Sequence, residues 1–142
     1  MVTIDKPPTE DSVCAFAERW TARLADEDYE GAFAMLCRVD DYPGKSWVAS
    51  ADELHCWIRH YGSLTPLPGE PDHRVTPIAS ATGERWANDV DLDPMSQRYP
   101  GYAGRLDWWL PLNGAWSDLQ ASFDLIDVGS RIAFVLVALR VP

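Results

Sequence analysis

The stretch GRLDWWLPLNGAWSDLQASFDLIDVGSRIAFVLVALRVP, from Gly104 to Pro142, decides the fold of this chain. It contains three apolar runs that are separated by two turn signals, Asn113-Gly114 and Gly129-Ser130. Asn-Gly between alternating apolar residues indicates a two-residue hairpin turn, because both central positions of a type I′ turn need a positive φ. The stretch therefore predicts an antiparallel sheet of at least three strands.

The spacing of apolar residues predicts which faces of these strands are buried. In the first two strands apolar and polar residues alternate, so one face of each should be buried. Trp116 has the wrong parity for the buried face, which predicts a β-bulge over residues 115–117. The third strand, from Ile132 onward, is apolar on both faces. Its outer side should therefore be covered by another part of the chain or by a second copy, and we expect a homodimer through the outer sheet face.

The N-terminal half predicts helices. Residues 1–8 are expected to be a short tail, and Thr9 is placed to cap a long amphipathic helix. A shorter helix should follow near Tyr29, and Ser50 with Glu53 forms a capping box that opens a third helix. Further strands are expected over 46–49, 75–81 and 85–92. Residues 1–142 should thus form one α+β domain, with N-terminal helices packed on one face of a curved antiparallel sheet.

Composition restricts the possible partners. The chain has 12 Lys and Arg residues against 22 Asp and Glu residues, giving a net charge of -10. This balance argues against nucleic acid and anionic membranes, and it favours a basic partner. The three cysteines share no motif spacing, so we expect reduced thiols in the cytoplasm. We expect no signal peptide, and no apolar run reaches the roughly 18 residues that a membrane span needs.

The predicted order of elements resembles the NTF2-like (cystatin-like α+β cone) superfamily over nearly the whole chain. Within it, Leu110–Leu119, LPLNGAWSDL, is similar to a bacterial family of small domains that carry an LPLxGxWSDL stretch and imply no particular activity. The wider resemblance implies a bent sheet around helices, a pocket at the open end of the cone and frequent homodimers. It covers isomerases, dehydratases, small-molecule binders, protein binders and proteins like toxin-immunity proteins, so the fold alone does not settle the function.

Aspartates and tryptophans alternate on the predicted strands, and they supply the candidate site. Asp107 is the weak candidate for a general base, with a tyrosine as hydroxyl donor, as in isomerases of the NTF2-like kind. The alternative is that these aspartates only solvate the outer face of the sheet. Arg105 is expected to pair with Asp107 or Asp118. The candidate binding residues are Trp20, Trp57, Trp86, Asp89, Arg105, Asp107, Trp108, Trp109 and Trp116.

A second cluster of side chains gives a weaker indication of a metal or catalytic site. Asp52, Cys56 and His60 follow one another at single-turn spacing on the third predicted helix. Cys and His one turn apart can act as metal ligands or as a nucleophile and base, but two ligands do not close a metal site. A solvated helix face explains the cluster more simply, so we expect no metal and no cofactor.

Three hypotheses for the function remain open. The first and preferred one is a non-enzymatic binding protein that captures a basic protein, as a toxin-immunity protein would. The second is a pocket for a small apolar ligand, or an isomerase- or dehydratase-like enzyme that uses a pocket carboxylate. The third is a structural or dimerisation module. A cone that is filled by tryptophan would argue against the second hypothesis, and an open cavity with a desolvated carboxylate would favour it.

Overall fold

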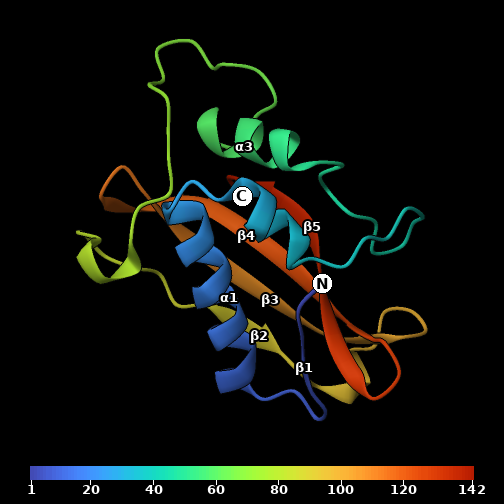
Figure 1. Ribbon diagram of the computed structural model, residues 1–142. Helices are drawn as coiled ribbons and strands as arrows, with labels where there is room; N and C mark the ends of the chain where they lie inside the picture. The colour runs from blue at the N-terminus through green and yellow to red at the C-terminus, as the bar shows by residue number, and fades with distance from the viewer.

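A computed structural model describes residues 1–142 as helices packed against a curled, five-stranded antiparallel sheet (Figure 1). The helices are α1 (Glu10–Ala25), α2 (Tyr29–Ala34) and α3 (Ala51–Arg59), with short 3-10 turns η1 (Ile78–Ser80) and η2 (Pro94–Ser96). The strands are β1 (Thr3–Asp5), β2 (Asp89–Asp91), β3 (Tyr102–Leu112), β4 (Ala115–Asp127) and β5 (Arg131–Arg140), in the sheet order β1-β5-β4-β3-β2. The predicted α+β architecture is confirmed.

The β3–β4 hairpin has the predicted turn. Asn113 and Gly114 both have positive φ angles, 51° and 86°. The predicted bulge is also present, slightly further along β4. Three residues of β4 lie between Trp116 and Gln120, whereas β3 has only Leu110 between their cross-strand partners. The Ser117 hydroxyl donates to the Leu110 carbonyl at 2.6 Å and thereby fixes the bulge, which turns Trp116 away from the regular alternation.

Aromatic rings fill the space between α1 and the sheet. Thr9 caps α1 as predicted, and the helix buries one face that includes Phe16 and Trp20. Phe16 stacks on Phe134 of β5 with ring centroids 3.7 Å apart, and Trp20 meets Phe123 of β4 edge-on at 5.0 Å. Full burial of one such side chain stabilises the fold by about 1.5–3 kcal/mol. The core of the protein therefore fills the space between α1 and the sheet.

The chain itself covers the outer face of β5. Val135 is fully buried and Ala138 is 5% exposed, although both lie on the side of the sheet away from α1. The loop that follows α2 lies on this side, because its residues 42–47 line one hollow together with Tyr99 and Ala138. Of the two covers predicted for this strand, the structure provides the intramolecular one. A homodimer through this face stays a prediction.

Several local predictions need correction. Residues 1–8 were expected to be a tail, but Thr3–Asp5 pair with β5 as an edge strand, to which Arg131 donates side-chain hydrogen bonds. The predicted strand 75–81 reduces to one bridge between Val75 and Leu112, because Pro77 has no N–H to continue a ladder. Only Asp89–Asp91 of the predicted strand 85–92 pairs with β3, and 46–49 is not a strand. None of the helices combines the length and apolar character that crossing a bilayer requires.

Candidate functional site

Two of the predicted binding residues belong to the core. Trp20 is fully buried and Trp108 is 1% exposed, so neither can contact a partner in this structure. The indole N–H of Trp108 donates to the hydroxyl of Thr21 at 3.0 Å, which satisfies its polar atom inside the interior. The main surface hollows are lined by neither indole. Trp57 is partly buried and packs on Trp47, with ring centroids 5.2 Å apart.

The candidate general base Asp107 lies on the outer face of the sheet. Its carboxylate accepts a 2.6 Å hydrogen bond from Ser122 and a 3.3 Å bond from Arg105, which confirms the predicted Arg105–Asp107 pair. Its cross-strand neighbour on β2 is the exposed Asp89. Asp107 is thus held by polar partners on the outer face of the sheet. Its chain neighbours Leu106 and Trp108 lie on the opposite face and point to the interior.

The remaining tryptophans form an acidic–aromatic surface, which we define as Glu84, Trp86, Asp89, Trp109, Trp116 and Asp118. Trp86 is its most prominent member, because 57% of this large side chain is exposed. The Trp86 ring meets Trp109 edge-on at 4.7 Å, and the Trp109 indole N–H donates to the Ala87 carbonyl at 3.1 Å. These contacts hold residues 86–87 against the edge of β3.

Part of this surface is concave. A hollow of about 410 Å³ at the hairpin end is lined by Glu84, Trp86, Trp116 and Asp118, together with Tyr61 and His73. One carboxylate oxygen of Asp118 is buried there and accepts no hydrogen bond from the protein. Buried acceptors are almost always satisfied, so this oxygen is an exception within the protein. The hollow therefore combines aromatic rings with an unsatisfied carboxylate.

Arg85 borders this surface, and the sequence did not reveal its position. Its guanidinium lies 4.5 Å from the ring of Trp108 and 4.3 Å from that of Trp116, between the interior and the acidic–aromatic surface. Burial lowers the pKa of Arg85, although Cys14 and Glu18 on α1 oppose this shift. The contact shows that the Trp116 ring already receives a cation on this surface. In the sequence, the only feature that pointed to Arg85 was its position next to Trp86.

A second and larger hollow, the outer-face hollow, lies over strands β3, β4 and β5. It has a volume of about 570 Å³ and is lined by residues 42–47 of the loop after α2, by Arg98 and Tyr99, and by Arg105, Asp124, Val137, Ala138 and Arg140 of the sheet. Of the predicted site residues it contains only Arg105. The others were not predicted because they come from four separate segments that share no local pattern.

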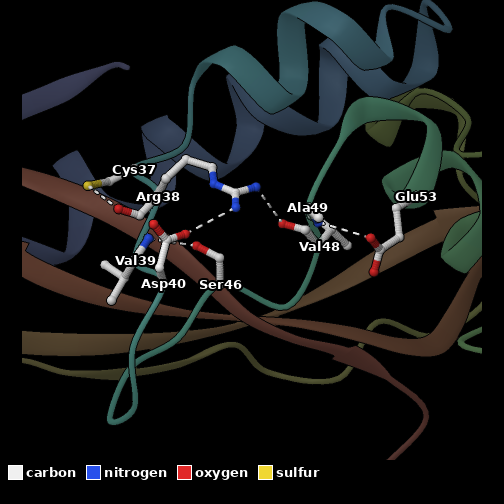
Figure 2. Close-up of polar contacts among 8 residues, drawn as sticks. All are labelled: Cys37, Arg38, Val39, Asp40, Ser46, Val48, Ala49 and Glu53. Carbon is white, nitrogen blue, oxygen red and sulfur yellow. Dashed lines mark hydrogen bonds and ion pairs between the residues drawn. The ribbon is translucent and has the colours of Figure 1, made fainter.

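Polar contacts hold the loop that forms one wall of the outer-face hollow (Figure 2). The Arg38 guanidinium donates to the Val48 carbonyl at 3.2 Å and to the carboxylate of Asp40 at 3.3 Å, across the two ends of the loop. The Val39 amide donates to the Ser46 hydroxyl at 2.9 Å, and the amide of Ser46 returns a 2.8 Å bond to Val39. These bonds close the loop at its base, so its tip at 42–45 has a defined position.

The floor of this hollow contains a buried acid. Asp124 is 4% exposed and accepts a 2.7 Å hydrogen bond from the Tyr99 hydroxyl, whereas its second oxygen has no partner. Burial raises the pKa of the Tyr99 phenol above its ordinary range, and the hydrogen bond to Asp124 raises it further. Tyr99 also packs closely against the loop, because a side chain at Gly44 would clash with the Tyr99 hydroxyl.

The Asp52, Cys56 and His60 cluster has a structural explanation. His60 follows the last residue of α3, and its Nδ1 lies 3.0 Å from the Leu64 carbonyl. No three His, Cys, Asp or Glu side chains are grouped closely enough to hold a metal ion. All three cysteines are free thiols, and burial raises the pKa values of Cys14 and Cys37.

The chain matches no protein-family model, no curated protein and no solved structure.

Proposed function

We propose that this chain is a non-enzymatic binding protein of the NTF2-like kind, which captures a basic protein through its acidic–aromatic surface. A toxin-immunity role is one form of such capture. The observation that carries the proposal is Trp86, an indole that is 57% exposed beside Trp109, Trp116 and the carboxylates of Glu84 and Asp118. Tryptophan is one of the residue types that are enriched among the anchors of protein interfaces.

The charges of the surface suit a cationic partner. A lysine or arginine entering the hairpin-end hollow would lie beside the exposed Trp86 ring, which can attract a cation, and beside the carboxylates of Glu84 and Asp118. The net charge of -10 would also speed the encounter with a basic protein, because the field of the whole molecule steers oppositely charged partners. Both effects weaken with salt.

The filled interior weighs against the alternative of a small-molecule pocket or an isomerase-like enzyme. Phe16, Trp20 and Trp108 fill the space between α1 and the sheet, so no open cavity is left there for a ligand. Asp107, the candidate base, faces the other side of the sheet and is engaged by Ser122 and Arg105. A general base of the isomerase kind lies in an apolar pocket, whereas Asp107 is hydrogen-bonded to Ser122 and Arg105 on the outer face of the sheet.

The test uses an immobilised peptide rich in lysine and arginine as the probe. Wild-type protein should bind it, and the affinity should fall steeply as salt is raised. Trp86→Ala and Asp118→Asn should each weaken binding roughly tenfold, as removal of one anchor of about 1.4 kcal/mol implies. Asp11→Asn, which removes one exposed carboxylate from the start of α1, is the matched control and should bind like the wild type. If the wild type and the three variants bind the peptide equally, the binding reflects only the overall acidity of the protein and the proposal is wrong.

A further inference from the structure

The outer-face hollow concentrates positive charge on an acidic protein. Four of the chain's 12 basic residues line it, namely Lys45, Arg98, Arg105 and Arg140, in a molecule whose net charge is -10. Arg105 pairs with Asp107, but Lys45, Arg98 and Arg140 have no ion-pair partner. Like charges that share a hollow repel one another, so an anion bound among them would be favoured.

The same hollow offers a hydrogen-bond acceptor at its floor. Asp124 is the only acidic residue of the lining, and one of its oxygens is bound by Tyr99. The other oxygen is buried and has no donor, although a buried carboxylate oxygen normally has one. A ligand that fits this hollow should therefore bring a hydroxyl or amine donor as well as negative charge.

The walls of the hollow are organised before any ligand arrives. The loop that carries Lys45 is closed by the Arg38 and Ser46 hydrogen bonds (Figure 2) and is attached to β5, where the Trp47 amide donates to the Leu136 carbonyl at 2.8 Å. Its tip packs on Tyr99, with no room for a side chain at Gly44. Preorganised sites lose less entropy on binding, and a volume of about 570 Å³ lies in the range of small-molecule sites.

We propose that the outer-face hollow binds a small organic anion, a carboxylate or phosphate ester that also carries a hydroxyl group. Lys45, Arg98 and Arg140 bind the anionic group, and the free oxygen of Asp124 accepts a hydrogen bond from the hydroxyl. The site is separate from the acidic–aromatic surface and does not depend on the proposed capture of a basic protein.

The experiment compares two pairs of probes by isothermal titration calorimetry at low salt. Citrate and tricarballylate differ by one hydroxyl among carboxylates, and glycerol 3-phosphate and propyl phosphate differ by hydroxyls beside a phosphate. We expect one hydroxylated probe to bind roughly tenfold more tightly than its partner, because a hydrogen bond to a charged group is the stronger kind. The pair in which the hydroxylated probe binds more tightly shows whether the site prefers a carboxylate or a phosphate ligand.

Variants then locate the site. Arg98→Gln combined with Arg140→Gln should weaken binding of the better probe at least tenfold, and Lys45→Gln alone should weaken it less, which also covers a failure of the double variant to fold. Arg19→Gln removes an exposed arginine that also lacks an ion-pair partner but lies on α1, and it should leave the affinity unchanged. Trp86→Ala should also have no effect, so the two proposals can fail separately.

Two results would overturn the inference. One is that none of the four probes binds more tightly than about 1 mM, which is the affinity of a weak general contact. The other is that a probe binds equally well to the wild type and to the Lys45→Gln variant and the double variant. Backbone amide shifts in a two-dimensional NMR spectrum give an independent check, since they should move at residues 42–47, 98–99 and 124.

Discussion

Thr21 is a hydroxyl-bearing residue inside an apolar interior, and both of its hydrogen bonds stay within that interior. It donates to the Ala17 carbonyl one turn earlier at 2.7 Å and accepts from the Trp108 indole at 3.0 Å. Thr21→Val keeps the shape but leaves the Trp108 N–H buried without an acceptor. We expect this change to lower the free energy of unfolding by about 1–3 kcal/mol, measured by urea denaturation.

Thr21→Ser is the control for this prediction, because it keeps the hydroxyl and removes only a methyl group. It should cost less than Thr21→Val, on the order of 1 kcal/mol for the lost methyl group. A valine variant as stable as the serine variant would mean that the hydrogen bond to Trp108 contributes nothing.

Tyr99 makes the stability of the fold sensitive to alkaline pH. Burial, together with the bond to Asp124, raises the pKa of Tyr99 in the folded protein, whereas unfolding returns it to about 10. The stabilisation is complete below that ordinary pKa and is lost as the pH rises toward the folded value. The free energy of unfolding of the wild type should therefore fall relative to that of Tyr99→Phe between about pH 9 and about pH 11.

Urea unfolding at the two pH values measures this difference. Tyr42→Phe is the matched control, since Tyr42 is 89% exposed and its removal should leave the pH response unchanged. If the wild type and Tyr99→Phe lose stability in parallel over this range, the proton bound by Tyr99 is not linked to folding.

At the scale of elements, Asn113 joins the β3–β4 turn to the long segment that precedes β2. Its side-chain oxygen accepts from the Arg74 amide at 3.1 Å, and its side-chain nitrogen donates to the Asp72 carbonyl at 3.3 Å. Asn113→Gly preserves a residue that tolerates φ of 51° but removes both bonds. Hydrogen exchange at the Arg74 amide should accelerate roughly fivefold, as the loss of about 1 kcal/mol implies, with the β3–β4 amides unchanged.

Asn113→Asp separates the two bonds in the same experiment. It keeps an oxygen for the Arg74 amide and loses the donor to Asp72, so exchange at Arg74 should stay near the wild-type rate. Faster exchange throughout the hairpin in Asn113→Gly would instead show that the asparagine stabilises the turn itself.

The elements that the sequence predicted correctly are those whose signals are local. Asn113-Gly114 specifies a hairpin turn by its backbone preferences, and Arg105 and Asp107 share a face because they are two residues apart on one strand. The strand predicted over 75–81 is not formed. The pattern of its apolar residues does not show whether a neighbouring strand will pair with it. The pairing of this segment with β3 is limited to the bridge between Val75 and Leu112, beside which the Thr76 amide donates to the Pro111 carbonyl.

At the scale of the whole molecule, the limits of prediction are set by distance along the chain. The outer-face hollow brings Lys45, Arg98 and Arg140 together from two loops and a strand, and no periodicity connects them. The burial of the seven tryptophans could not be predicted for the same reason. Ring size and hydrophobicity do not distinguish Trp20, which is fully buried, from Trp86, which is largely exposed, until the packing of helix on sheet is known.

The position of β1 affects how the protein is made on the ribosome. β5 lies between β1 and β4 in the sheet, and Arg131 of β5 binds Thr3, which is translated 128 residues earlier. During synthesis, β1 has no partner in the sheet until β5 has left the ribosome. The sheet is therefore completed only after β5 has been synthesised, and a nascent chain stalled before residue 131 would expose Phe123 and α1 to chaperones.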